Sequence, residues 1–142
     1  MNGVFTDSNV ILNHLRDDKR STEMLKKIQS GEIKGYVNQI VFSEVLYTYM
    51  KYVTKEKSYG LKKNPEKIKD IKIGDTVALF DLFEFLHFDD SMLGLTEEMI
   101  TTYGLLPNDA LIAATCKSYG IRDIATFDND FKRVDFLNVW RL

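Results

Sequence analysis

Short apolar segments with strand character alternate with longer segments of helical periodicity along this 142-residue chain. Five strands are predicted, at residues 3–6, 35–38, 86–88, 123–126 and 136–140. A strand can return to a parallel neighbour only through a crossover, and a helix is the usual crossover. The alternation therefore predicts an α/β fold, a three-layer α/β/α sandwich with a mainly parallel five-stranded sheet.

Helices are predicted between these strands. The longest runs from Val41 to about Tyr59, because apolar residues recur in it at intervals of four, three and four. Other helices are predicted to start at residues 7–9, at Ser21 or Thr22, near Asp75, at Thr96 and at Pro107. The lysine-rich stretch 51–72 is predicted to be the end of the long helix followed by a charged connection.

The size of the chain fits one domain covering residues 1–142. With 44% apolar residues the chain can build a packed core. Its one cysteine, Cys116, cannot form an intrachain disulfide, and no cysteine and histidine spacing suits zinc. Neither a secretion signal nor an apolar run of membrane-spanning length is found in the sequence. We therefore expect a cytoplasmic protein with no membrane partner.

The net charge of −2 conceals two halves of opposite sign. Residues 1–72 carry 14 basic and 9 acidic side chains, and residues 73–142 carry 5 basic and 12 acidic ones. The first half is thus +5 and the second −7. This division is compatible with a basic surface for a polyanion beside an acidic site for cations, and equally with ordinary solvated helix faces.

Four carboxylates are predicted to meet at one edge of the sheet. Asp7 follows the first strand, and Asp128 follows the fourth. Glu44 and Asp109 lie in the first turns of predicted helices that start at the same edge. The functional crevice of such a fold lies beyond the carboxyl ends of the strands. We therefore expect the four acids to share one pocket.

Carboxylates this close together repel one another. Two of them at about 5 Å, in an effective dielectric of about 20, repel by roughly 3 kcal/mol. The cluster must therefore bind protons or cations, and its oxygen ligands suit Mg²⁺ or Mn²⁺. Such a cation acidifies a water for attack on phosphorus and shields charge in the transition state.

Each acid alone also has a simpler explanation. Asp7, Glu44 and Asp109 occupy positions where a negative group stabilises the start of a helix. Asp128 and Asp130 lie where a carboxylate commonly shapes a turn. The functional interpretation depends on the agreement of their predicted positions, which independent helix caps would not require.

Four sequence patches resemble the motifs of PIN-domain nucleases, especially the VapC-type toxins. They are Val-Phe-Thr-Asp-Ser-Asn at 4–9, Phe-Ser-Glu-Val at 42–45, Asn-Asp-Ala-Leu-Ile-Ala-Ala-Thr at 108–115 and Ala-Thr-Phe-Asp-Asn-Asp-Phe at 125–131. The order of the patches and the length of the chain both fit that family. The patches around Asp109 and Asp128 are the most specific.

This resemblance implies a Mg²⁺- or Mn²⁺-dependent ribonuclease, the toxin of a toxin-antitoxin pair. It would hydrolyse RNA to a 5′ phosphate and a 3′ hydroxyl, as a homodimer inhibited by a small antitoxin protein. The catalytic and metal-binding acids would be Asp7, Glu44, Asp109 and Asp128, with Asp130 joining or orienting them. Asn9 and Thr126 would be polar supports of these acids, although such residues near turns often bond only to backbone.

Lysines follow Glu44 along the predicted long helix. Lys51 and Lys55 are 7 and 11 positions after Glu44, and at about 100° per residue they share its azimuth. We hypothesise that both lysines bind RNA phosphates. An ordinary exposed lysine stripe explains the same spacing.

Two other functions compete with the nuclease interpretation. A PIN fold without activity would serve as an interaction scaffold, which intact acids make less attractive. A phospho-receiver domain would use Asp89 as its phosphorylated residue and Thr126 as its switch hydroxyl. The sequence lacks the acid pair that a receiver needs after the first strand. A receiver also needs a lysine after the fifth strand, where this sequence has only Arg141.

Overall fold

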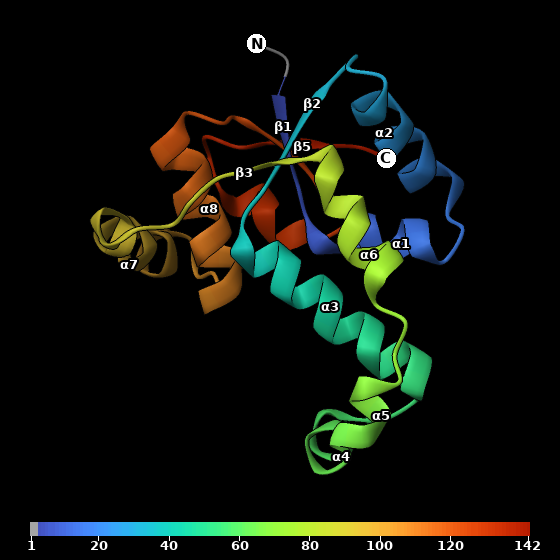
Figure 1. The fold of residues 1–142 in the computed structure, drawn as a ribbon. Coiled ribbons are helices and arrows are strands. Elements are labelled where there is room, and N and C mark those ends of the chain that lie inside the picture. The colour runs from blue at the N-terminus through green and yellow to red at the C-terminus, as the bar shows by residue number, and fades with distance from the viewer. Residues whose placement is uncertain (1–2) are drawn as a thin grey trace.

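A computed structural model describes residues 3–142, and its centre is a five-stranded parallel sheet (Figure 1). The strands are β1 (Gly3–Thr6), β2 (Lys34–Val37), β3 (Glu84–Phe85), β4 (Asp123–Ala125) and β5 (Asn138–Trp140). Their order across the sheet is β3-β2-β1-β4-β5, and every neighbouring pair is parallel. The predicted fold class is confirmed.

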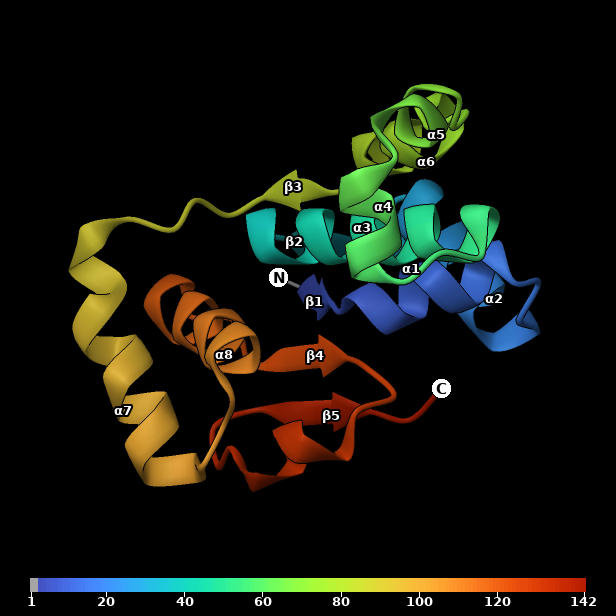
Figure 2. The same cartoon turned by 90° about the horizontal axis from the view of Figure 1, so that it is seen from below.

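Helices cover both faces of this sheet. They are α1 (Ser8–Leu15), α2 (Lys19–Gln29), α3 (Gln39–Thr54), α4 (Ser58–Lys63), α5 (Pro65–Lys69), α6 (Gly74–Ala78), α7 (Leu93–Tyr103) and α8 (Pro107–Tyr119), with 3-10 turns η1 (Leu79–Leu82), η2 (Asp90–Met92) and η3 (Asn129–Arg133). Figure 2 shows α7 and α8 on one side of the sheet and α1, α2 and α6 on the other. Along the chain, β1, β2 and β3 follow one another to one edge of the sheet, and β4 and β5 are then added on the other side of β1. The strand β1 therefore lies at the centre of the sheet.

The core explains the apolar runs of the strands. Val4 and Phe5 in β1 are fully buried, as is Ile124 in the neighbouring β4. Parallel strands covered on both faces need apolar side chains at consecutive positions. In β2, a Cβ at Gly35 would lie 2.8 Å from atoms of both Ile28 and Phe83. Glycine at this position therefore lets α2 and the segment before β3 pack closely on the strand.

Side-chain caps fix the starts of two helices. Asn38 is fully buried, and its Oδ1 accepts hydrogen bonds from the backbone N–H groups of Ile40 and Val41 at the start of α3. Asp18 caps α2 and accepts from the N–H of Ser21. The predicted start at Ser21 or Thr22 was therefore late, because the charged residues before them belong to the helix rather than to a loop.

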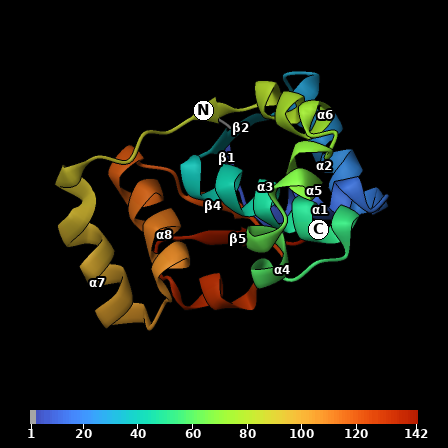
Figure 3. The same ribbon diagram turned by 60° about the horizontal axis from the view of Figure 1, so that its bottom comes forward.

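The lysine-rich segment forms an arm that projects from the body (Figures 1 and 3). The long helix was predicted to reach Tyr59, but α3 ends at Thr54, where Lys55 takes a left-handed conformation with φ of 57°. The chain then forms α4 and α5 rather than an irregular connection. Leu61 of α4 is buried, and Lys67 of α5 forms an ion pair with Glu56, which follows α3, at 2.6 Å.

Two boundaries near β3 also differ from the prediction. The predicted helix from Asp75 to Phe85 ends earlier, at Ala78, and is followed by the 3-10 turn η1. The strand β3 accordingly comes two residues before the predicted one. The ring centroid of Phe80 lies 6.1 Å from that of Phe83 and 6.0 Å from that of Phe85. We attribute the early end of the helix and the early start of β3 to packing of these rings. No helix in the described part of the chain is long and apolar enough to cross a membrane.

Candidate acidic site

The pairing of the central strands β1 and β4 brings together the residues that follow each of them. β1 pairs with β4, so that Thr6 lies opposite Ala125. The backbone N–H of Asp7 donates to the carbonyl of Ala125 at 3.0 Å and extends this pairing beyond the strand. Asp7 and Thr126 therefore leave the sheet side by side, although 119 residues separate them in sequence.

Thr126 is the hub of a hydrogen-bond network around Asp7. Its hydroxyl donates to Asp7 Oδ2 at 2.7 Å and accepts from the backbone N–H of Asp128 at 2.9 Å. The other Asp7 oxygen accepts from the backbone N–H of Ser8 at 2.7 Å, so Asp7 also caps α1. The carboxylate is only 4% exposed and is held in a single orientation by these contacts.

Asn9 joins the same network from α1. Its Nδ2 lies 3.4 Å from Asp7 Oδ2 and 3.2 Å from Thr126 Oγ1, as a donor to both. Its Oδ1 accepts from the backbone N–H of Phe127 at 3.1 Å. Asn9 and Thr126 therefore touch the acids directly, where sequence reasoning placed them as polar supports.

Glu44 and Asp109 approach this network from two different helices. Glu44 lies in the second turn of α3, after the Asn38 cap, and Asp109 lies in the first turn of α8. Asn108 Nδ2 donates to Glu44 Oε2 at 3.3 Å and so connects the two helices. A second link joins them through Asn38 Nδ2, which donates to Thr115 Oγ1 at 3.1 Å.

The charges of the acids act on one another. The pKa of Asp7 is raised to about 6, mainly by burial and also by the charges of Glu44 and Asp128, against the hydrogen bonds from Thr126 and Ser8, which lower it. Burial also raises the pKa of Asp109 to about 7, together with the charges of Asp7, Asp128 and Glu44 and a hydrogen bond with Asp128. The structure thus brings all four predicted acids into one electrostatic cluster.

Two of these acids, Asp109 and Asp128, form with Asp130 a group of carboxylates that could hold a cation, and this group does not include Asp7 or Glu44. One oxygen each from Asp109, Asp128 and Asp130 lies within 4.8 Å of the others. In an octahedral Mg²⁺ site with bonds of about 2.1 Å, adjacent ligands are about 3.0 Å apart and opposite ligands about 4.2 Å, so these oxygens would move closer together to share one ion. The donors are all hard oxygens, and they therefore fit Mg²⁺ or Mn²⁺.

The turn after β4 shapes this part of the site. Asp128 caps η3 by accepting from the backbone N–H of Asp130 at 2.8 Å. Asp130 in turn accepts from Arg133 Nη1 at 3.1 Å. The turn-forming role considered for both aspartates is therefore present, and it coexists with their place in the acidic cluster.

Several predicted or missed residues lie around this cluster. Lys51 Nζ lies 4.7 Å from the ring centroid of Tyr47, one turn along α3 from Glu44. Lys55 lies beyond the helix end, so it does not continue the row that the predicted longer helix implied. The sequence assigned no role to Arg133, whose partners are distant in sequence, or to Asn108, although Asn108 begins the family-like patch at 108–115.

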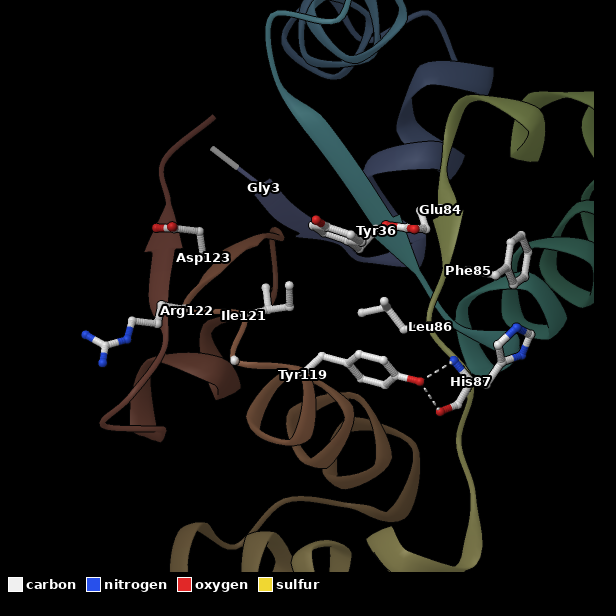
Figure 4. A pocket seen from close by; sticks show the side chains of 11 residues that line it. Gly3, Tyr36, Glu84, Phe85, Leu86, His87, Tyr119, Ile121, Arg122 and Asp123 are labelled. Carbon is white, nitrogen blue, oxygen red and sulfur yellow. Dashed lines mark hydrogen bonds between the residues drawn. The ribbon is translucent and has the colours of Figure 1, made fainter. Parts of the chain in front are cut away.

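A second hollow lies at the opposite edge of the sheet. It has a volume of about 520 Å³ and is lined by the amino ends of β1, β3 and β4, among other segments (Figure 4). Two acids line it, and both have partners: Glu84 Oε2 lies 3.4 Å from Lys34 Nζ, and Asp123 Oδ1 accepts from Asn138 Nδ2 and from Trp140 Nε1, each at 2.9 Å. The Tyr119 hydroxyl closes one side by bonding to both backbone groups of His87. None of the four clustered acids lines this hollow.

The fold and the acidic cluster define a parallel α/β protein with a carboxylate site at the carboxyl edge of its sheet. The PIN domain model matches residues 4–137, and the chain therefore belongs to the PIN domain family. This membership ends the phospho-receiver alternative. Consistent with that, Asp89 caps the 3-10 turn η2 by accepting from the backbone N–H of Ser91 at 2.9 Å.

Relatives of the chain support the same family. It is 41% identical over 138 residues to Ribonuclease VapC2 of Methanocaldococcus jannaschii, covering 97% of this chain and 93% of that protein. It is 34% identical over 147 residues to Ribonuclease VapC6 of the same organism, covering 96% and 95%. Among solved structures, a toxin-antitoxin complex from Klebsiella pneumoniae is similar in fold, with a TM-score of 0.63, 17% identity and 95% of each chain covered.

Proposed function

We propose that this protein is a metal-dependent endoribonuclease, a single PIN domain that acts as the toxin of a toxin-antitoxin pair. The observation that carries the proposal is the group of Asp109, Asp128 and Asp130, whose oxygens lie within 4.8 Å of one another. Asp7 is joined to the turn of Asp128 through Thr126, and Glu44 is joined to the start of α8 through Asn108. Family membership supports the nuclease chemistry, and two relatives more than 30% identical are named ribonucleases.

The acids are proposed to hold Mg²⁺ or Mn²⁺, with Asp130 as a further ligand or as a support of Asp128. A cation bound there supplies charge shielding at the scissile phosphate and acidifies a water for in-line attack. The neighbouring polar side chains orient the acids. Thr126 and Asn9 keep the Asp7 carboxylate in one orientation, so its oxygens need no reordering when the substrate arrives.

The proposed substrate path runs along α3 away from Glu44. Lys51 would bind an RNA phosphate one to two turns from the acid, and the adjacent Tyr47 ring, whose residue is 43% exposed, offers a surface for base stacking. Lys55 is proposed as a second phosphate contact at the end of α3. An ordinary solvated lysine remains the competing explanation, and the salt dependence of RNA binding separates the two.

Protein partners are proposed as well. Similarity in fold to a toxin-antitoxin complex supports a small antitoxin as an inhibitor of this chain. A homodimer is proposed from the PIN-domain resemblance. The antitoxin would reduce the access of RNA to the acidic cluster, and the second copy of the chain would shape the approach to it. Any activity measurement therefore requires protein purified free of antitoxin.

The deciding experiment is cleavage of single-stranded RNA in the presence of Mg²⁺ or Mn²⁺. Wild type is compared with Asp7→Asn and Asp109→Asn, with circular dichroism to check folding, and with Asp81→Asn as a control at an exposed acid outside the cluster. We expect cleavage by wild type and the control, and loss of activity in both site variants. Cleavage retained by the folded site variants would exclude the mechanism. Metal binding without cleavage of any RNA would favour the inactive scaffold.

A further inference from the structure

One arginine connects the two segments that carry the cation-type cluster. Arg133 is the last residue of η3, and its guanidinium donates to three acceptors. Nε donates to the carbonyl of Tyr103 at 2.8 Å and Nη2 to the carbonyl of Gly104 at 3.1 Å. Nη1 donates to Asp130 Oδ1 at 3.1 Å.

The acceptors belong to different parts of the site. Tyr103 and Gly104 form the end of α7, from which a short connection leads to Asp109 in the first turn of α8. Asp130 lies in the turn whose first residue is Asp128. Arg133 therefore ties the segment that carries Asp109 to the segment that carries the other two carboxylates.

The planar guanidinium suits this task better than any other cation. Its donors have fixed relative directions, so three simultaneous hydrogen bonds fix the relative positions of their acceptors. The bond to Asp130 is made to Oδ1 and not to Oδ2 of the carboxylate. The side chains of Arg133 and Asp130 are 48% and 50% exposed, and exposed ion pairs contribute little to folding stability. Stability alone is thus a poor explanation of the arrangement.

We propose that Arg133 is a positioning residue that keeps the carboxylates of Asp109, Asp128 and Asp130 close enough together to bind one divalent cation. The inference rests on the proposed metal-dependent function. Arg133 touches neither the cation nor RNA in this role; it acts through the α7 end and through Asp130.

The test is a Mn²⁺ titration of RNA-free protein, followed by the electron paramagnetic resonance signal of the free ion. Arg133→Lys keeps the positive charge and loses the three-way fork. Lys132→Gln, at the neighbouring exposed lysine of the same turn, loses a charge and keeps the fork. We expect Arg133→Lys to weaken Mn²⁺ binding about tenfold, the lower end of the range for residues that orient metal ligands. Lys132→Gln should bind Mn²⁺ as wild type does.

Asp109→Asn is included to show that the measured ion occupies this cluster, and thermal unfolding verifies that each variant is folded. If Asp109→Asn loses Mn²⁺ while Arg133→Lys binds it as tightly as wild type, the positioning role is overturned and the proposed function survives. Equal weakening in Arg133→Lys and Lys132→Gln would overturn it too, because the fork would then be irrelevant. If wild type binds no Mn²⁺, the proposed metal-dependent function itself fails.

Discussion

Asp7→Asn should make the metal-free protein more stable at neutral pH, although it removes a proposed catalytic group. The folded-state pKa of Asp7 is raised from 3.8 to about 6. At 1.36 kcal/mol per pKa unit, ionising this buried carboxyl destabilises the folded state by roughly 3 kcal/mol. Protonated Asp7 thus contributes stability to the folded state. This contribution is fully present below pH 3.8, is lost as the pH rises through about 6, and stays lost above that.

The asparagine cannot replace every contact of the carboxylate. Both Asp7 oxygens accept hydrogen bonds, from the Ser8 N–H and from the Thr126 hydroxyl, whereas an asparagine side chain has one oxygen. The lost hydrogen bond offsets the gain by about 1 kcal/mol. We therefore expect the variant to be more stable than wild type by roughly 2 kcal/mol at pH 8, which is roughly 6 °C in Tm for a domain of this size.

The assay is calorimetric or fluorescence-detected unfolding in EDTA at pH 4 and pH 8. At pH 4 the advantage of the variant should disappear, because Asp7 is then protonated in folded wild type and, like the asparagine, has one carbonyl oxygen and no charge. Adding Mn²⁺ at pH 8 should stabilise wild type and not the variant, since a ligand stabilises the state that binds it. An Asp7→Asn protein less stable than wild type by the same amount at both pH values would refute the reasoning, because Asp7 would then act only as a helix cap.

Three further variants test the supports of the site and the path of RNA. Thr126→Val should cost about 1–3 kcal/mol in urea unfolding, because it leaves buried hydrogen-bonding groups unpaired, and it should raise the pKa of Asp7 further. Asn38→Ala should cost about 1–2 kcal/mol through loss of the α3 cap, measured in the same way. Replacing Lys51 and Lys55 with alanine should weaken binding of single-stranded RNA and make the dependence of log K on log salt shallower by about 1.4.

Matched controls decide how these results are interpreted. Thr126→Ser keeps the hydroxyl and should retain most of the stability; equal losses in both variants would mean that the methyl group, not the network, matters. Alanine at Lys26 and Lys27, exposed residues of α2, should leave the salt dependence unchanged. If both lysine pairs lower RNA binding alike, α3 has no special part in it.

Local signals and the order of the elements were enough to predict the sheet and its acidic edge. Strands in α/β proteins carry apolar residues at consecutive positions, and β1, β2 and β4 show this pattern clearly. Once these strands are parallel, Asp7 and Asp128 must leave the sheet at the same edge. The four acids could therefore be grouped before any coordinates were known.

Other features depend on contacts that sequence periodicity does not encode. The helix α3 ends at Thr54 because Lys55 takes a left-handed conformation, and a lysine has no propensity signal for that conformation. The strand β3 is two residues long, shorter than any periodic pattern can identify. Arg133 looked like one more charged surface residue, because its three acceptors lie in segments that come together only in the folded chain.

The pairing of β1 with β4 has a consequence for synthesis of the protein. Asp7 leaves the ribosome well before its partner Thr126 and the neighbouring Asp128, because 119 residues separate Asp7 from Thr126. A nascent chain therefore carries an incomplete acidic site until the segment after β4 has been translated. A shortened chain that stops before β4 would keep Asp7, Glu44 and Asp109 and lack Asp128, and its β1 would have no β4 to pair with.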